Sequence, residues 1–160
     1  MRAILIDSEG AAPRLLEDAD ESLLTGEVAL DVEFSSLNYK DAMALAGKGI
    51  ARAHPLIPGI DLVGTVTESA DARFSPGDAV VLNGDGIGES RHGGFATRAR
   101  VRAEALVRLP ADLGRSTVRG QYAAGWQGGD KVIGYLDEDG VADGSTTETY
   151  AAMRLDIDTR

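Results

Sequence analysis

The chain contains no cysteine, so its 160 residues hold no disulfide and no thiolate site for zinc or an iron–sulfur cluster. It contains only two histidines, His54 and His92, which are too few for a histidine-rich metal site. Basic residues are also scarce, because 16 lysines and arginines stand against 26 aspartates and glutamates, a net charge of −10. This balance argues against a broad nucleic-acid or anionic-membrane surface. We therefore expect no metal, no nucleic-acid partner and no membrane partner.

Long apolar runs are missing as well. The first residues, Met1 to Asp7, stop being apolar too early for a signal peptide. No run approaches the roughly 20 residues that a membrane-spanning helix needs. The apolar fraction of 43% is ordinary for a globular protein. The sequence therefore predicts a cytoplasmic protein, long enough for one domain with its own hydrophobic core.

What the sequence does contain is a series of short apolar runs separated by 20 glycines and five prolines. Residues 27–34 alternate, with Val28, Leu30, Val32 and Phe34 on one face, as in a half-buried antiparallel strand. The one predicted helix covers residues 39–46 and is stopped by the glycines that follow. These elements predict a mainly β fold, a partly open β-barrel with a short helix. Its further strands are predicted over residues 3–6, 62–67, 79–82, 94–101 and 106–109.

The pattern of apolar runs and turn residues changes after residue 114. Residues 118–122 are a short strand candidate, and residues 123–144 read as a loop rich in glycine and aspartate, broken by a short apolar run. Residues 146–157 alternate again and predict the best strand of this part.

We therefore predict three parts. They are a barrel domain over residues 1–114, a junction at residues 115–117, and a strand-loop-strand segment over residues 118–160. Because a barrel that lacks its last strands has open edges, the segment is expected to extend it or to pack on another subunit.

Several motifs in the first part occur in a characteristic order. They are Ser-Ser-Leu-Asn-Tyr-Lys-Asp at residues 35–41, Pro-Gly-Ile-Asp at 58–61, Gly-Asp-Ala-Val at 77–80 and His-Gly-Gly-Phe-Ala at 92–96. With these motifs the part resembles the N-terminal region of zinc-free medium-chain reductases, the quinone oxidoreductase and acryloyl-CoA reductase group. The resemblance implies a GroES-like barrel that carries catalytic groups, followed by a Rossmann domain that binds NADPH.

The resemblance places Asn38, Tyr39, Lys40 and Asp41 in the cleft that faces nicotinamide and substrate. Asn38 can donate a hydrogen bond to a carbonyl, and Tyr39 or Lys40 can stabilise or protonate an enolate. Structural roles are also compatible with these residue types: Asn38 as a helix cap, Asp41 as a complement to the helix dipole, and Lys40 in solvent. We expect the four to be vestigial catalytic positions, inherited and idle.

The loop Gly84-Asp-Gly-Ile-Gly88 invites comparison with a nucleotide-binding fingerprint. Such a fingerprint must open a helix, whose N-terminus meets the pyrophosphate. Here Arg91-His-Gly-Gly94 and another strand come next, so the loop is expected to be a flexible wall of the cleft. The resemblance puts the loop of His92 near this cleft, which makes Asn38 and His92 the expected cofactor-binding residues.

The last part carries a second set of motifs: Arg-Gly-Gln-Tyr at residues 119–122, Gly-Tyr-Leu at 134–136 and Ser-Thr-Thr-Glu-Thr-Tyr-Ala-Ala at 145–152. In order and spacing they resemble an internal stretch of bacterial glucose-6-phosphate dehydrogenase, from its large β-sheet domain. That resemblance transfers no catalytic role, because the nucleotide fingerprint and catalytic histidine region of that family are missing from the match. Two such resemblances in one chain indicate a chimera, segment-shuffled or engineered, with a natural gene fusion as the alternative.

The expected function is that of a folded chimeric or artificial protein without complete catalytic machinery, derived from an NADPH-dependent quinone or acryloyl-CoA reductase. No bound cofactor is expected, although NADPH is implied for the parent family, since no nucleotide-binding motif follows the barrel. The alternatives are a residual NADPH-dependent oxidoreductase acting on quinones or α,β-unsaturated thioesters, and a simple binding module. Open strand edges and a long loop predict a homo-oligomer that exchanges a strand.

Overall fold

The structure, a computed structural model, describes residues 1–109, 122–127 and 130–135, which belong to two compact units. The first unit contains seven strands, a helix and two single-turn 3-10 helices, and the second contains a hairpin. The strands are β1 (Ala3–Leu5), β2 (Arg14–Leu16), β3 (Val28–Phe34), β4 (Asp61–Ser69), β5 (Ala79–Asn83), β6 (Arg98–Val101), β7 (Leu106–Arg108), β8 (Tyr122–Gln127) and β9 (Asp130–Tyr135); the helices are η1 (Glu21–Leu23), α1 (Tyr39–Leu45) and η2 (Ala103–Ala105).

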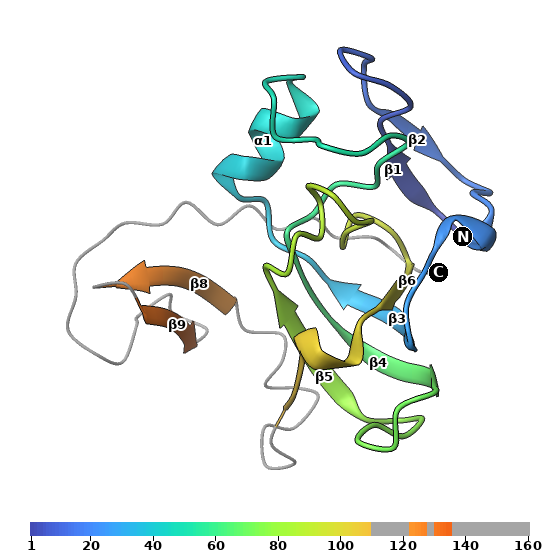
Figure 1. Ribbon diagram of the computed structural model, residues 1–160, viewed down its shortest axis with the longest axis vertical. Coiled ribbons are helices and arrows are strands. Elements are labelled where there is room, and N and C mark those ends of the chain that lie inside the picture. The colour runs from blue at the N-terminus through green and yellow to red at the C-terminus, as the bar shows by residue number, and fades with distance from the viewer. Residues whose placement is uncertain (110–121, 128–129, 136–160) are drawn as a thin grey trace. The chain divides into compact units, whose positions relative to one another are not determined.

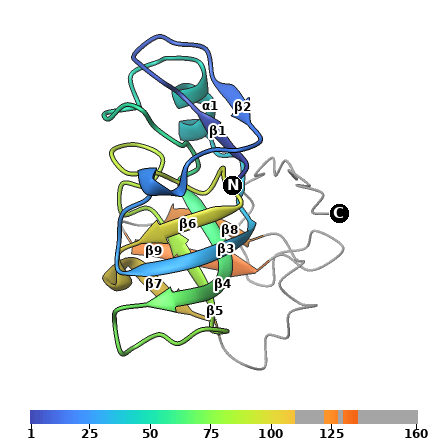
Figure 2. The same cartoon turned by 90° about the vertical axis from the view of Figure 1, so that its right-hand side faces the viewer.

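A five-stranded antiparallel sheet in the order β6-β3-β4-β5-β7 forms the centre of the first unit (Figures 1 and 2). Strands β3 and β4 pair from Val28↔Ser69 to Phe34↔Val63, with two register shifts. Gly64 allows them to approach closely, because a Cβ at this position would lie 2.3 Å from the carbonyl oxygen of Asp31. Within the described residues the outer strands β6 and β7 do not pair with each other, so the sheet is open.

One face of the sheet packs into the larger hydrophobic core. Val28 and Leu30 are fully buried, as their alternation predicts, whereas Phe34 at the end of β3 is 36% exposed. Full burial of a valine or leucine side chain stabilises a fold by roughly 1.5–3 kcal/mol, so this core contributes strongly to the stability of the unit. Its buried members are Val28, Leu30, Leu62, Val66, Phe74, Val80, Leu82, Ile87, Ala99, Val101, Ala103 and Leu106.

A smaller core lies beneath the β1–β2 hairpin. The N–H of Ile4 donates to the carbonyl of Phe95 at 2.9 Å, and Ile6 exchanges backbone hydrogen bonds with Leu56. These bonds tie the chain before β6 and the chain before β4 to the N-terminal hairpin. The buried members of this core are Ala3, Leu5, Ala19, Ile57, Phe95 and Ala96.

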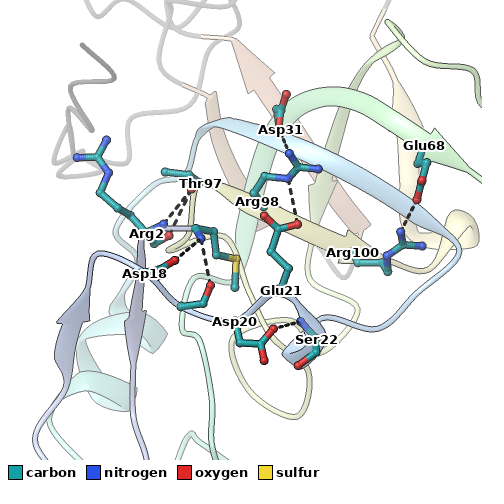
Figure 3. Close-up of polar contacts among 12 residues, drawn as sticks. Arg2, Asp18, Asp20, Glu21, Ser22, Asp31, Glu68, Thr97, Arg98 and Arg100 are labelled. Carbon is teal, nitrogen blue, oxygen red and sulfur yellow. Dashed lines mark hydrogen bonds and ion pairs between the residues drawn. The ribbon is translucent and has the colours of Figure 1, made fainter.

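The arginines of β6 are matched by acidic side chains from neighbouring elements (Figure 3). Arg98 lies 3.7 Å from Glu21 and 3.4 Å from Asp31. Arg100 lies 2.5 Å from Glu68 of β4. The positive charges of Arg98 and Arg100 are therefore compensated by nearby carboxylates.

The predicted mainly β fold with one short helix is confirmed, and α1 ends one residue before the predicted end. The predicted strand at 94–101 is too long, because β6 begins at Arg98 and the preceding residues bond to the N-terminal segment instead. Strand β2 and both 3-10 helices were not predicted. Among the described residues no helix is long and apolar enough to cross a bilayer.

The prediction of a loop over residues 123–144 is wrong where the second unit is described. Strands β8 and β9 pair antiparallel there, from Tyr122↔Tyr135 to Gln127↔Asp130. The two short apolar runs pair through their backbones although each of them contains a glycine. The predicted strand at 146–157 and most of the one at 118–122 lie outside the described residues.

Candidate functional site

The candidate site is the segment between β3 and α1, which packs against the turn that leads into β4. Asp41, in the first turn of α1, is fully buried with an exposed fraction of 0%. It is the one buried charged residue among the described residues. A buried carboxylate requires hydrogen-bond donors, since an unpaired charge in the interior costs several kcal/mol.

Backbone N–H groups supply these donors. The Oδ2 of Asp41 accepts from the N–H of Asn38 at 2.8 Å, which caps the first turn of α1. Its Oδ1 accepts from the N–H of Gly59 at 3.2 Å and of Ile60 at 3.0 Å. Asp41 therefore fastens the helix to the turn before β4, a larger role than complementing the helix dipole.

Asp61 makes the reciprocal connection. Its Oδ1 accepts from the N–H of Ser36 at 2.7 Å, and its Oδ2 accepts from the Ser36 hydroxyl and from Nδ2 of Asn38 at 2.9 Å. The Ser35 hydroxyl donates to the Asp61 carbonyl at 2.8 Å. Two carboxylates thus hold residues 35–41 and residues 58–61 together from both sides. We call this arrangement the double clasp.

Burial raises the pKa of the Asp41 carboxyl above its ordinary value of 3.8. The nearby Asp61 carboxylate acts in the same direction, and hydrogen bonds from Asn38 and Ile60 oppose it. Burial dominates because the side chain is withdrawn from water.

Gly59 lets the turn pass against the chain before β6. Its φ of +101° lies in a region that residues with a Cβ rarely adopt. A Cβ at Gly59 would also lie 2.7 Å from the backbone nitrogens of Gly94 and Phe95. The glycine therefore brings the clasp close to the Gly93-Gly94 segment.

Asn38 is the N-cap residue of α1, as the structural alternative predicted. Its Nδ2 donates to Asp61 Oδ2 at 2.9 Å and to Ser36 Oγ at 3.0 Å. Because the Ser36 hydroxyl is itself hydrogen-bonded to Asp61 Oδ2, both acceptors lie on the same side of Nδ2. The predicted catalytic and cofactor-binding roles of Asn38 stay predictions.

Tyr39 and Lys40 differ in whether their polar groups have a partner among the described residues. Tyr39 is 81% exposed, and its hydroxyl makes no hydrogen bond with the described residues. Lys40 is exposed, in agreement with the expectation that it lies in solvent, and its Nζ lies 2.6 Å from Glu89 Oε1. Of the predicted catalytic residues, Tyr39 is the one whose polar group faces solvent without a partner among the described residues.

His92 follows the clasp residues in sequence, and its ring is held by a backbone N–H group. Its Nδ1 accepts from the N–H of Ile57 at 3.1 Å, which places the ring proton of the neutral form on Nε2. Burial lowers the pKa of His92 from its ordinary value of 6.5. Its predicted role in cofactor binding stays a prediction.

The loop that begins at Gly84 does not open a helix, in agreement with the expectation that it is no nucleotide fingerprint. Asp85 has a φ of 55°, and its carboxylate binds the guanidinium of Arg102. Glu89, in the same loop, carries the ion pair with Lys40. No group of three or more potential metal ligands occurs within the residues that the structure describes.

Three residues of this site were missed at the level of sequence: Ser36, Asp61 and Glu89. The Pro58-Gly-Ile-Asp61 motif was recognised without a role for its aspartate. A signal did exist, since two serines and an asparagine within four residues supply short side-chain donors for a nearby carboxylate.

Comparison with known proteins identifies the class of the first unit. Residues 25–111, more than half of the chain, match the alcohol dehydrogenase GroES-like domain family, and the chain belongs to this family. The predicted GroES-like architecture is therefore confirmed. The structure also resembles that of the yhdH oxidoreductase from Salmonella enterica in complex with NADP, with a TM-score of 0.65 and 48% identity, over 71% of this chain and 36% of that one.

Curated relatives give the same picture. The probable acrylyl-CoA reductase AcuI of Escherichia coli is 48% identical over 116 residues, which are 71% of this chain and 36% of the relative. The putative quinone oxidoreductase YhfP of Bacillus subtilis is 45% identical over 94 residues, 58% of this chain and 28% of the relative. The chain thus spans little more than a third of the length of the acrylyl-CoA reductase relative.

The end of the chain matches a different family. Residues 99–160 match the glucose-6-phosphate dehydrogenase, C-terminal domain family. Glucose-6-phosphate 1-dehydrogenase 2 of Mycobacterium tuberculosis is 56% identical over 61 residues, which are 38% of this chain and 12% of that enzyme. A reductase-like first part and a dehydrogenase-like last part are consistent with the predicted chimera.

Proposed function

We propose that the first unit is the substrate-side barrel of an NADPH-dependent reductase acting on quinones or α,β-unsaturated thioesters, and that this chain alone does not complete the catalyst. The observation that carries the first half of the proposal is the double clasp. Asp41 and Asp61 hold the Asn38-Tyr39-Lys40 segment through contacts that lie entirely within the first unit. The candidate catalytic segment therefore needs no other domain for its shape.

The second half of the proposal rests on the sequence that comes after the barrel. The match to the glucose-6-phosphate dehydrogenase domain already begins at residue 99, inside the last strands of the reductase-like part. The acrylyl-CoA reductase relative has about two thirds of its length outside the matched region. Hydride transfer requires a cofactor held in place against the substrate, and the sequence after Leu109 resembles no cofactor-binding segment.

An activity assay tests this proposal. The full chain is mixed with NADPH and either acryloyl-CoA or a small quinone, and NADPH oxidation is followed. We expect no oxidation above that of buffer. Oxidation that scales with protein concentration and saturates with either substrate would contradict the proposal.

The exposed Tyr39 favours a second candidate, a residual oxidoreductase. Its hydroxyl is free to donate to a substrate oxygen, whereas Asn38 and Lys40 are bound to other side chains. General-acid catalysis contributes about 10²–10⁴-fold to rates. If residual turnover exists, Tyr39→Phe is expected to remove most of it without changing stability, and Lys40→Met to remove little.

Self-association by strand exchange is a separate proposal. The outer strands β6 and β7 leave sheet edges open within the described residues, and such edges recruit further strands. Light scattering of the full chain is expected to give the mass of an oligomer. A monomer at every concentration would remove the idea.

A further inference from the structure

The chain contains two asparagines, Asn38 and Asn83, and only the second is followed by a glycine. A glycine after an asparagine favours deamidation, because it has no side chain to hinder ring closure. Asn83 is the last residue of β5 and is only partly buried, and Gly84 follows it with a φ of +85°. Deamidation is therefore favoured at Asn83, whereas the bulky Tyr39 hinders it at Asn38.

The reaction needs no reactant besides water. The backbone nitrogen of Gly84 loses its proton and attacks Cγ of Asn83, a C–N bond forms, and the side-chain nitrogen leaves as ammonia. The cyclic succinimide then takes up one water and opens at either of its two carbonyls. The product is an aspartate or an isoaspartate, and in an isoaspartate the main chain passes through the former side chain.

The fold holds the two reacting groups apart. The N–H of Gly84 donates to the carbonyl of Ile60 at 2.9 Å, so the attacking nitrogen is held by a backbone hydrogen bond. Asn83 pairs with Asp61 across β4 and β5, and this pairing restrains the backbone rotation that ring closure requires. Succinimide formation therefore requires the end of β5 to separate from β4 by local opening.

Ile60 connects this backbone hydrogen bond to the double clasp. Its carbonyl accepts from Gly84, and its own N–H donates to Asp41 Oδ1 at 3.0 Å. Asp61, the other carboxylate of the clasp, is the cross-strand partner of Asn83. The same two carboxylates that hold the candidate site thus also hold the strand that restrains Asn83 and Gly84.

The product of deamidation would add a charge beside the clasp. Because Gly84 bonds to Ile60, the next pair, Asp61 and Asn83, is one without backbone hydrogen bonds, in which opposite Cβ atoms lie about 4.5–5.5 Å apart. An aspartate at position 83 would therefore lie opposite the carboxylate that accepts from the N–H of Ser36 at 2.7 Å. Like charges in such a pair are destabilising. An isoaspartate would lengthen the main chain and disturb the register.

We propose that Asn83 is a deamidation site that the double clasp protects, and that the product of the reaction weakens the clasp from the opposite strand. Opening of the clasp thus speeds the modification, and the modification makes the clasp open more often. This inference goes beyond the proposed function and holds whether or not the chain is a catalyst.

The first test incubates the full chain in mildly alkaline buffer, native or unfolded in guanidinium chloride, and follows both asparagines by peptide mass spectrometry. Asn83 is expected to deamidate at least about 10-fold more slowly in the native chain, since it reacts only by local opening. Hydrogen exchange of the Gly84 N–H should be slowed by a similar factor. Asn38 is the internal reference and should react slowly in both states. Equal rates for Asn83 in the two states, or no reaction in the unfolded chain, would overturn the proposal.

Asp41→Ala tests the role of the clasp. It removes the acceptor of the Ile60 N–H and is expected to speed deamidation of Asn83 severalfold in a chain that remains folded, whereas Asp7→Ala, at an exposed ion pair, should not. If Asp41→Ala does not fold, Ser36→Ala takes its place with a smaller expected effect, because it removes one hydroxyl donor to the other clasp carboxylate. An unchanged rate in the folded variant would overturn the link between the clasp and Asn83.

Asn83→Asp introduces the charge of the product directly. Hydrogen exchange of the Ser36 N–H, which donates to Asp61, is expected to become about 2- to 5-fold faster at low salt and to return toward the parent rate at high salt. Ser8→Asp adds the same charge at an exposed position and is the matched control. An unchanged exchange rate in Asn83→Asp would overturn the effect of the product on the clasp.

Discussion

Asp41 and Asp61 each bind the chain segment that carries the other. Asp41 on α1 accepts from the N–H of Ile60 at 3.0 Å, beside Asp61, and Asp61 accepts from Nδ2 of Asn38 at 2.9 Å, beside the start of α1. The two segments are about 20 positions apart in sequence and make no strand pairing with each other. Carboxylate side chains thus join these two segments, as backbone hydrogen bonds join neighbouring strands of a sheet.

Asp41→Ala is expected to destabilise the fold by about 2–5 kcal/mol, because it leaves the N–H groups of Asn38, Gly59 and Ile60 without their acceptor, at about 1–3 kcal/mol for each buried one. Urea unfolding gives the free energy. Asp7→Ala, at an exposed ion pair, is the control and should change the free energy of unfolding little. A loss below about 1 kcal/mol for Asp41→Ala would mean that water replaces the carboxylate.

The raised pKa of Asp41 predicts a particular pH dependence. Because the folded state holds this proton more tightly than the unfolded chain does, the part of the stability that is linked to this proton is complete below pH 3.8 and is lost as the pH rises through the raised pKa. NMR titration of the Asp41 carboxyl carbon measures the pKa directly. A midpoint at or below 3.8 would show that the three N–H donors outweigh burial.

His92 predicts the opposite dependence. Its pKa is lowered by burial, so its contribution to stability is present above pH 6.5 and is lost as the pH falls through the lowered pKa. His92→Asn keeps an acceptor near the position of Nδ1 for the N–H of Ile57 and removes the titration. Its free energy of unfolding should depend less on pH between about 7 and 5 than that of the parent chain. An unchanged slope would assign the dependence to other groups.

Two glycine substitutions separate steric conflict from backbone strain. Gly59→Ala adds a Cβ 2.7 Å from two backbone nitrogens at a φ of +101°, and is expected to cost more than about 3 kcal/mol. Gly49→Ala adds a Cβ in open space at a φ of +76°, and is expected to cost about 1–2 kcal/mol for the left-handed conformation alone. Thermal unfolding of both variants gives the comparison. Equal losses would argue that the Gly59 turn moves away from the chain before β6.

The sequence allowed the sheet to be predicted, because buried and exposed positions alternate with the period of a strand. Val28 and Leu30 in β3, and Ala99 and Val101 in β6, are buried as this pattern requires. The hairpin of β8 and β9 was missed although the Gly128-Gly129 pair is a known signal of a two-residue turn. The glycines of this region favour a loop, but the apolar runs beside them form strands β8 and β9.

The site was predicted only in part. The motif at residues 35–41 pointed to the right segment, but not to the burial of Asp41 or to the partners of Asn38. These depend on the turn before β4, whose approach is set by β3–β4 pairing and by Gly59. No periodic pattern encodes a contact between an irregular segment and a turn. Such contacts arise only in the assembled fold.

We propose that the chain preserves a reductase-like barrel with its candidate catalytic segment in place but does not by itself hold NADPH. Titration of NADPH with the full chain, followed by nicotinamide fluorescence, tests it most directly. We expect no saturable change in the micromolar range. A saturable change in that range, removed by Asp61→Asn or His92→Ala and unaffected by Asp7→Asn, would contradict it.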